Sequence, residues 1–245
     1  MTHIRLFLIA CFFFHSTAAS AASETAWKMV QKEKWLGTQT INFASNGVKI
    51  VNAGRGFSIV SKAPDWDVVL YREDDKIFCR LKRQQYYNSV AFRVSHGHTP
   101  GKVLKIYTIG PVTAPMHYTP YHNDVIKRFE NVPVEVEDML SSYFRANCVD
   151  GIVLRSVSNS IGKSKADASV FMPIDMGGIA VLRETLSLNK VAYNPLDFQV
   201  PKNLRPVNDI KQITTGKAKR KEAESIFLDM GVGDELGVRE QRRSN

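Results

Sequence analysis

Four histidines lie close together in the middle of the chain, and their imidazole nitrogens are suited to bind zinc or copper. They are His96, His98, His117 and His122. In an extended segment, His96 and His98 point to the same side, as a pair of ligands needs. Metal sites usually combine such a pair with a close carboxylate or cysteine, and the spacing from His98 to His117 is uninformative. The pattern therefore favours solvated loop histidines, and a histidine-based metal carrier is kept as a further alternative.

The sequence contains no recognisable constellation of catalytic residues. We find no nucleophile elbow, and no serine or cysteine with a nearby histidine in a known pattern. Glu135, Glu137 and Asp138 are crowded carboxylates, but they begin a predicted helix, whose dipole favours anions there. Residues 162–164 end like a phosphate-binding loop, yet Val157 stands where that loop requires glycine. We therefore expect a protein that is not an enzyme and has no cofactor.

The first residues of the chain have the composition of a secretory signal peptide. Arg5 gives a positive start, residues 6–14 form a continuous apolar run, and residues 19–21 are small, as a signal-peptidase site requires. The apolar run is shorter than the roughly 20 residues that cross a bilayer. We therefore expect residues 1–21 to be removed and the mature protein to be periplasmic or secreted.

Two cysteines, Cys79 and Cys148, remain after removal of the signal peptide. An even number in an exported chain fits a disulfide, and closing so long a loop would stabilise the fold by about 4 kcal/mol. Cys79 alternates into a predicted strand, where a buried free thiol is also common. The sequence leaves both possibilities open, a Cys79–Cys148 bridge or free thiols.

The chain is basic, with a formal net charge of +9. In an exported protein, a positive net charge favours binding to anionic lipid, cell-envelope polymer or an acidic protein over binding to nucleic acid. Lys217, Lys219, Arg220 and Lys221 form a basic cluster near the end of the chain. Such a run is usually a solvated surface, and contact with an anionic membrane or a partner is the functional alternative. We expect no nucleic-acid partner, and peripheral membrane contact stays open.

Residues 27–87 have the pattern of consecutive antiparallel strands. Apolar and polar residues alternate, as in Ile41 and Phe43, and turn residues separate the runs. Asn46-Gly47 predicts a type I′ hairpin turn, in which both residues have positive φ. The runs follow one another too closely for helical crossovers, so neighbours must pair antiparallel.

The rest of the chain adds one clear helix and further strands. The helix is predicted over about 134–146, where Val136, Met139, Leu140, Tyr143 and Phe144 form one apolar stripe. Strands are predicted over 102–109, 151–157, 169–174 and 179–188, and residues 84–95 suit either helix or strand. Three prolines between residues 111 and 120 predict an irregular segment.

The order of these elements resembles that of the periplasmic outer-membrane lipoprotein carriers (LolA/LolB-like). The resemblance lies in residues 38–41 leading to 46–50, in residues 63–71, and in residues 188–201 with Phe198 and Pro201. It implies a mainly β fold with a few helices (α+β), an antiparallel half-open β-barrel of about eleven strands with a helical lid. It also implies an apolar cavity for acyl chains. In this arrangement residues 22–207 form the half-barrel domain, and residues 208–245 form a charged, partly mobile tail.

The predicted function is that of an exported carrier that holds a lipid or a lipoprotein acyl chain in an apolar cavity. If the sheet curls, one apolar face of the strands and the helix stripe would line that cavity. The candidate residues are Trp27, Met29, Ile41, Phe43, Val48, Ile50, Phe57, Ile59, Val68, Leu70, Met139, Leu140 and Tyr143. The same residues could instead make a filled core, or the opposite face could be inside. The alternative function is then a cell-envelope protein-interaction module with a filled barrel and a basic docking tail.

Overall fold

The computed structural model describes residues 25–89, 101–118, 122–144, 151–158 and 181–219. The fold is mainly β with a few helices, as the sequence predicts. The strands are β1 (Thr25–Glu33), β2 (Gly37–Ala44), β3 (Gly47–Asn52), β4 (Phe57–Lys62), β5 (Val68–Arg72), β6 (Ile77–Leu81), β7 (Val103–Ile109), β8 (Val112–Tyr118), β9 (His122–Lys127), β10 (Ile152–Ser158), β11 (Val181–Ala192) and β12 (Arg205–Pro206). The helices are α1 (Arg83–Ser89), α2 (Val134–Phe144), the 3-10 turn η1 (Pro195–Phe198) and α3 (Ile210–Thr215).

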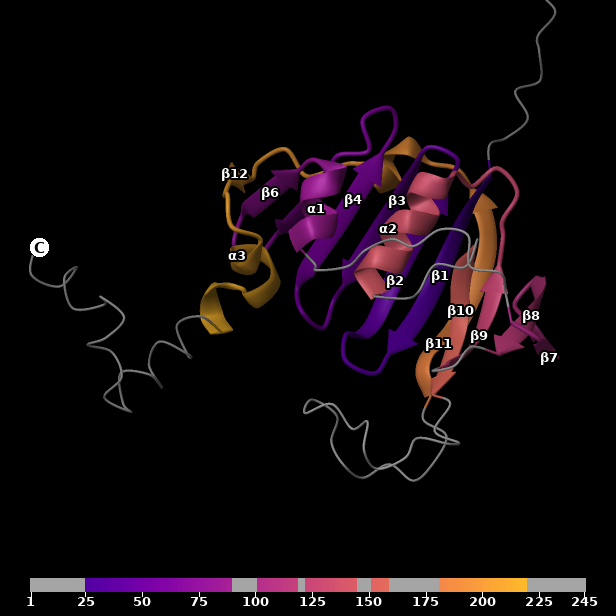
Figure 1. The fold of residues 1–245 in the computed structure, drawn as a ribbon. Helices are drawn as coiled ribbons and strands as arrows, with labels where there is room; N and C mark the ends of the chain where they lie inside the picture. Colours follow the sequence, from indigo (N-terminus) through magenta and orange to yellow (C-terminus); the bar gives the residue numbers. More distant parts are fainter. Residues whose placement is uncertain (1–24, 90–100, 119–121, 145–150, 159–180, 220–245) are drawn as a thin grey trace, which may run out of the picture.

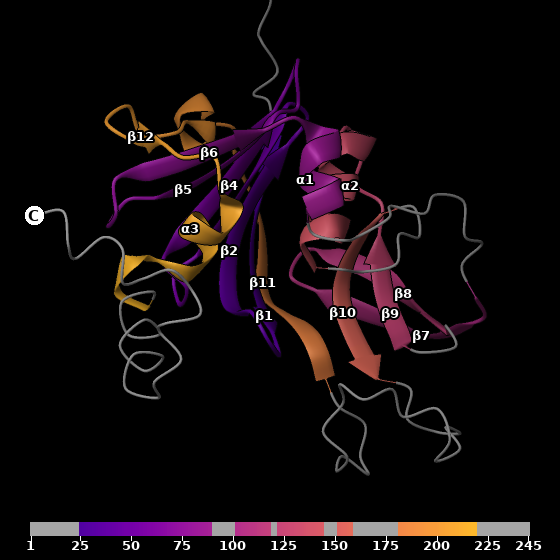
Figure 2. The ribbon, with the colours of Figure 1, turned by 60° about the vertical axis from the view of Figure 1, so that its left-hand side comes forward.

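The twelve strands form one open sheet in the order β12-β6-β5-β4-β3-β2-β1-β11-β10-β9-β8-β7. Neighbouring strands are antiparallel, except that β12 pairs with β6 in parallel. The sheet is bent at β1 and β11, so that α1 and α2 lie between its two arms (Figures 1 and 2). The predicted half-open barrel with covering helices is therefore confirmed at the level of architecture.

Alternating side chains build the concave face of this sheet. Met29, Ile41, Ile50, Ile59 and Leu70 lie opposite one another in register across β1 to β5. All five are buried in the same core cluster. Because side chains alternate across a strand, this one row fixes which face of the meander is inside.

The apolar stripe of α2 covers that concave face, as its spacing predicts. Val136, Met139 and Leu140 are buried in the same cluster, and Tyr143 packs against it. Glu135 and Glu137 lie in the first turn of α2. No helix in the described part of the chain is long and apolar enough to cross a membrane.

The proline-rich segment is regular, which corrects the sequence analysis. Residues 112–118 form β8, and Pro115 lies opposite Ile106 of β7. The ladder between β8 and β9 begins only at Met116. Pro115 therefore lies where β8 is paired on one side, and a residue without an N–H is tolerated there.

The hairpin between β2 and β3 is present, but its predicted turn type is wrong. Ala44 pairs with Gly47, and neither Asn46 nor Gly47 has positive φ. A Cβ at position 47 would lie 3.1 Å from a ring carbon of Phe198. Glycine therefore serves close packing here, and the Asn46 side chain donates to the Tyr193 hydroxyl at 2.7 Å.

The packed domain extends beyond residue 207. Residues 210–215 form α3, which packs on β5 and β6, and Ile213 is completely buried. Part of the segment assigned to the tail is therefore packed against the sheet. Residues 220–245 lie outside the described part.

Candidate functional site

A cavity of about 570 Å³ lies between the concave face of the sheet and the three α-helices. It is at the end of the sheet where the turns after β1 and β3 meet the C-terminal end of α2. Its lining residues are Glu33, Trp35, Leu36, Arg55, Phe57, Ile59, Leu70, Tyr86, Ser142, Tyr143, Phe144, Ile210 and Thr214. Small-molecule sites generally measure roughly 300–1,000 Å³, so this cavity is large enough to hold a ligand.

The floor of the cavity is apolar. Phe57 and Ile59 come from β4, Leu70 comes from β5, and Tyr86 comes from α1. Ile59 and Leu70 are directly opposite each other in the antiparallel ladder. Ile59 and Leu70 also belong to the buried row of the concave face. The cavity therefore begins where that row ends.

One wall is the last turn of α2, with Ser142, Tyr143 and Phe144. The Tyr143 hydroxyl accepts a hydrogen bond from the Asn52 side-chain amide at 3.2 Å. Burial raises the pKa of Tyr143 to about 12. The phenol therefore stays protonated at neutral pH, and its O–H group remains a donor.

A buried arginine holds the end of α2 in place. Arg183 of β11 donates to the Phe144 carbonyl oxygen at 2.9 Å, and its guanidinium lies 4.3 Å from the centre of the Phe144 ring. Arg183 is the cross-strand neighbour of Glu33. Burial lowers the pKa of Arg183 to about 10, so it stays charged at neutral pH.

The mouth of the cavity is formed by the turn after β1. Glu33 is buried, and its Oε2 accepts hydrogen bonds from the amides of Trp35 at 2.8 Å and Leu36 at 2.6 Å. The Trp35 side chain is 59% exposed, and the Lys34 ammonium lies 5.6 Å from the ring centre. Exposed tryptophan beside lysine combines an apolar ring with positive charge at the entrance.

Arg55 stands on the other side of the mouth, in the turn between β3 and β4. Its Nη2 donates to the Trp35 carbonyl oxygen at 2.7 Å, which links the two turns. Its backbone amide donates to the Asn52 side chain at 3.0 Å, and its carbonyl oxygen accepts from Arg72 at 2.7 Å. These backbone contacts fix the position from which the exposed side chain extends.

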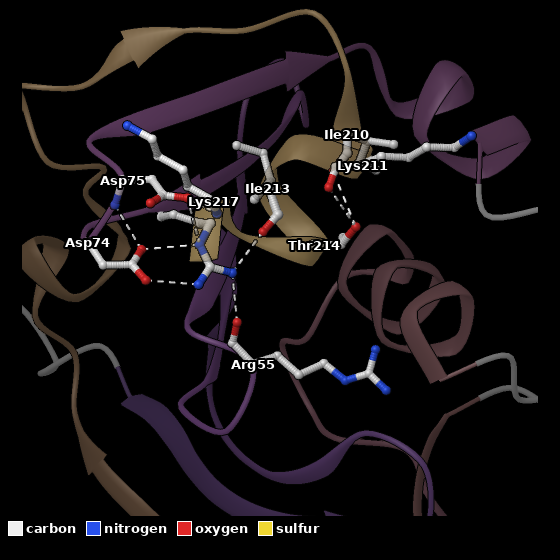
Figure 3. A network of polar contacts seen from close by, with 9 residues as sticks. Arg55, Asp74, Asp75, Ile210, Lys211, Ile213, Thr214 and Lys217 are labelled. Atoms are coloured by element: carbon white, nitrogen blue, oxygen red, sulfur yellow. Dashed lines mark hydrogen bonds and ion pairs between the residues drawn. The ribbon is translucent and has the colours of Figure 1, made fainter. Parts of the chain in front are cut away.

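The C-terminal helix closes the third side and is held by Arg72. Arg72 Nη1 donates to the Ile213 carbonyl oxygen at 3.0 Å, and Nη2 pairs with Asp74 at 2.8 Å (Figure 3). Asp75 Oδ2 accepts from the Lys217 amide at 2.7 Å. Hydrogen bonding by Arg72 holds the pKa of Asp74 below its usual value. This network positions Ile210 and Thr214 of α3 against the cavity.

The structure divides the predicted cavity residues into two groups. Phe57, Ile59, Leu70 and Tyr143 line the cavity. The other nine pack in the core, namely Trp27, Met29, Ile41, Phe43, Val48, Ile50, Val68, Met139 and Leu140. Phe129 is one reason why residues at this end do not line the cavity. Its ring packs edge-on against Trp27 and Phe43, with ring centres 4.8 Å and 5.2 Å apart. That end of the concave face is therefore filled by the protein itself.

The residues of the mouth were not predicted from the sequence. Trp35, Leu36 and Arg55 lie in turns, and their hydrophobic period gives no sign of a shared site. Ile210 and Thr214 lie in the segment assigned to the tail. One sequence signal for the mouth was the turn Gly54-Arg55-Gly56. Arginine is the only large side chain in this turn, because glycines flank it.

The histidines and cysteines are only partly within the described residues. His117 and His122 lie on β8 and β9, while His96 and His98 lie outside the described ranges. No group of three potential metal ligands occurs among the described residues. Cys79 is a buried free thiol whose pKa is raised by burial, and Cys148 lies outside the described part. The metal site and the Cys79–Cys148 bridge stay predictions.

Comparison with known proteins assigns the chain to no family. No protein-family model and no curated protein matches the chain. One similar solved structure is that of an uncharacterized conserved protein from Thermus thermophilus. It is 9% identical, the match covers 77% of this chain and 92% of that chain, and the TM-score is 0.26. That similarity is too low to support a conclusion about fold or function.

Proposed function

We propose that the protein is an exported carrier that binds a lipid or a lipoprotein acyl chain in the cavity beneath α2. The observation that carries this proposal is an apolar cavity of about 570 Å³ at the open end of a curved sheet. Its floor of Phe57, Ile59 and Leu70 offers shape and apolar surface but no nucleophile. A hydrocarbon chain is the ligand chemistry that such a surface recognises best.

The expected affinity comes from burial of the chain alone. Each methylene removed from water contributes about 0.8 kcal/mol, so ten buried methylenes contribute about 8 kcal/mol before the costs of association. The resemblance in sequence pattern supports the same ligand class, and it remains a proposal.

The test is extraction of the purified protein with organic solvent, followed by mass spectrometry. We expect a bound lipid or fatty acid, and a fluorescent fatty acid that is displaced by unlabelled lipid. Repeated absence of both bound lipid and displacement, from protein that is folded by circular dichroism, would reject the proposal.

An envelope protein-interaction module is the second candidate, because β7 ends the sheet among the described strands and is apolar on its surface. Val103 and Leu104 are each 48% exposed, and Ile106 is 56% exposed. Sheet edges of this kind pair with strands of other proteins. A photo-crosslinking residue at Ile106 should then trap one defined protein in cells, while the same residue at exposed Arg128 should not. Equal labelling at both positions would reject this candidate.

A truncation can test the docking tail without damage to the cavity. Removal of residues 220–245 leaves α3 and its contact with Arg72 intact. A partner that is lost on this truncation favours docking through the basic tail. A partner that is retained assigns the contact to residues before 220, which include Lys217 and Lys219.

A further inference from the structure

The polar groups around the cavity differ in how far they are already satisfied. The Ser142 hydroxyl donates to the Met139 carbonyl oxygen at 2.9 Å, and the Thr214 hydroxyl donates to the Ile210 carbonyl oxygen at 3.3 Å. Both hydroxyl protons are therefore used within their own helices. Neither is a strong candidate for contact with a ligand.

The carboxylate of Glu33 is also committed. Its Oε2 accepts two backbone hydrogen bonds from the following turn, and Arg183 stands opposite it on β11. These two bonds hold the carboxylate oxygen against the turn after β1. Glu33 Oε2 is therefore used by its own turn, and the carboxylate lines the cavity beside Arg55.

Two lining residues, Arg55 and Tyr143, keep hydrogen-bond donors that no bond among the described residues uses, and both are bonded to Asn52. Arg55 uses one of its five N–H groups on the Trp35 carbonyl oxygen, and its guanidinium forms no ion pair within the described part of the chain. In Figure 3 this guanidinium points away from the Arg72 network. The Tyr143 hydroxyl accepts from Asn52 and keeps its own proton available.

An arginine that forms no ion pair within the described part of the chain, together with a phenol donor, favours a particular ligand at the mouth of an apolar cavity. The hydrocarbon part fits the floor, and the polar end must accept hydrogen bonds and carry negative charge. Lys34 above Trp35 adds further positive charge to the entrance. A cationic head group would be repelled by Arg55, and an uncharged one would accept hydrogen bonds without balancing the charge of the guanidinium.

We propose that the cavity takes a single-chain anionic amphiphile, a long-chain carboxylate, and that the Arg55 guanidinium and the Tyr143 hydroxyl bind its head group. This inference rests on the proposed function, and it names the ligand class. A carboxylate can accept two parallel hydrogen bonds from the planar guanidinium. The hydroxyl of an alcohol of equal length cannot.

The experiment compares hexadecanoate with hexadecan-1-ol as displacers of an uncharged fluorescent dye from the mature full chain. The variants are Arg55→Gln, Arg55→Lys and Tyr143→Phe, with Arg128→Gln as the matched control at an exposed arginine outside the cavity. We expect the wild type and the control to prefer hexadecanoate about tenfold or more, as a charge-assisted hydrogen bond gives. Arg55→Gln should lose that preference and keep its affinity for the alcohol.

The remaining variants and the pH dependence separate a head-group contact from a general effect on folding. Arg55→Lys should keep part of the preference, and Tyr143→Phe should lose a smaller part. Protonation of the ligand at low pH should abolish the preference in the wild type. Equal binding of both ligands by the wild type, or an unchanged preference in Arg55→Gln, overturns the inference and leaves the proposed function standing. Failure of the wild type to bind either chain overturns the proposed function itself.

Discussion

Arg72 on β5 donates a hydrogen bond of 3.0 Å to the carbonyl oxygen of Ile213, which is 141 positions later in the chain. The same guanidinium bonds the Arg55 carbonyl oxygen at 2.7 Å and pairs with Asp74. One buried side chain therefore ties the C-terminal helix to a turn at the cavity mouth (Figure 3). The contact holds Ile210 and Thr214 of α3, which line the cavity.

Arg72→Met should weaken both the fold and the closure of the cavity. The Ile213 and Arg55 carbonyl oxygens lose their donor, so we expect the free energy of unfolding to fall by about 2–3 kcal/mol. Urea denaturation measures this change, and limited proteolysis should cut near residue 216 faster. Arg128→Met is the control. An equal effect of both substitutions would contradict a specific role for Arg72.

Filling the cavity should separate binding from stability. Ile59→Phe places its added atoms in the cavity, so we expect a change in stability below about 1 kcal/mol and loss of dye binding. Its cross-strand neighbour Ile50 lies in the packed core. Ile50→Phe should therefore destabilise the fold by about 1–3 kcal/mol through overpacking. Similar stabilities for the two variants would mean that the space at Ile59 is not open.

The ion pair of Asp74 predicts a loss of stability in acid. Its pKa in the folded protein lies below the ordinary value of 3.8, so the anion is favoured by folding. This contribution is complete above pH 3.8 and is lost as the pH falls through the lower folded pKa. The stability difference between wild type and Asp74→Asn should therefore be largest near neutrality and shrink below pH 3.8. A difference that grows in acid has the opposite sign and would refute the assignment.

Much of the architecture could be predicted from the sequence, because its signals are local. Alternation placed Ile41, Ile50 and Ile59 on one face, and the stripe of α2 identified the surface that covers them. Turn geometry was less predictable. Gly47 packs tightly against Phe198 of η1, a distant residue whose position no local rule indicates.

The cavity itself could not be located from the sequence. Whether a concave face is filled depends on distant side chains such as Phe129, which packs on Trp27 and Phe43. The mouth joins two turns and a short C-terminal helix, and only Ile210 and Ile213 distinguish that helix from the charged tail. Long-range packing of this kind has no periodic signature.

Cys79 gives a test of the predicted disulfide. The structure places it as a buried free thiol with a raised pKa, and both features slow its reaction with thiol reagents. We expect little alkylation of Cys79 in the native protein and complete alkylation in denaturant without a reductant, measured by peptide mass spectrometry. Failure of Cys79 to react in denaturant until a reductant is added would establish a bridge instead.

The central claim is that a hydrocarbon chain occupies the space beneath α2, and a crystal structure with a terminally brominated hexadecanoate tests it most directly. We expect the anomalous signal of bromine inside the cavity, beside Phe57, Ile59 and Leu70, with the carboxylate toward Arg55. Bromine found only at the protein surface, or side chains that fill this space in the crystal, would contradict the claim.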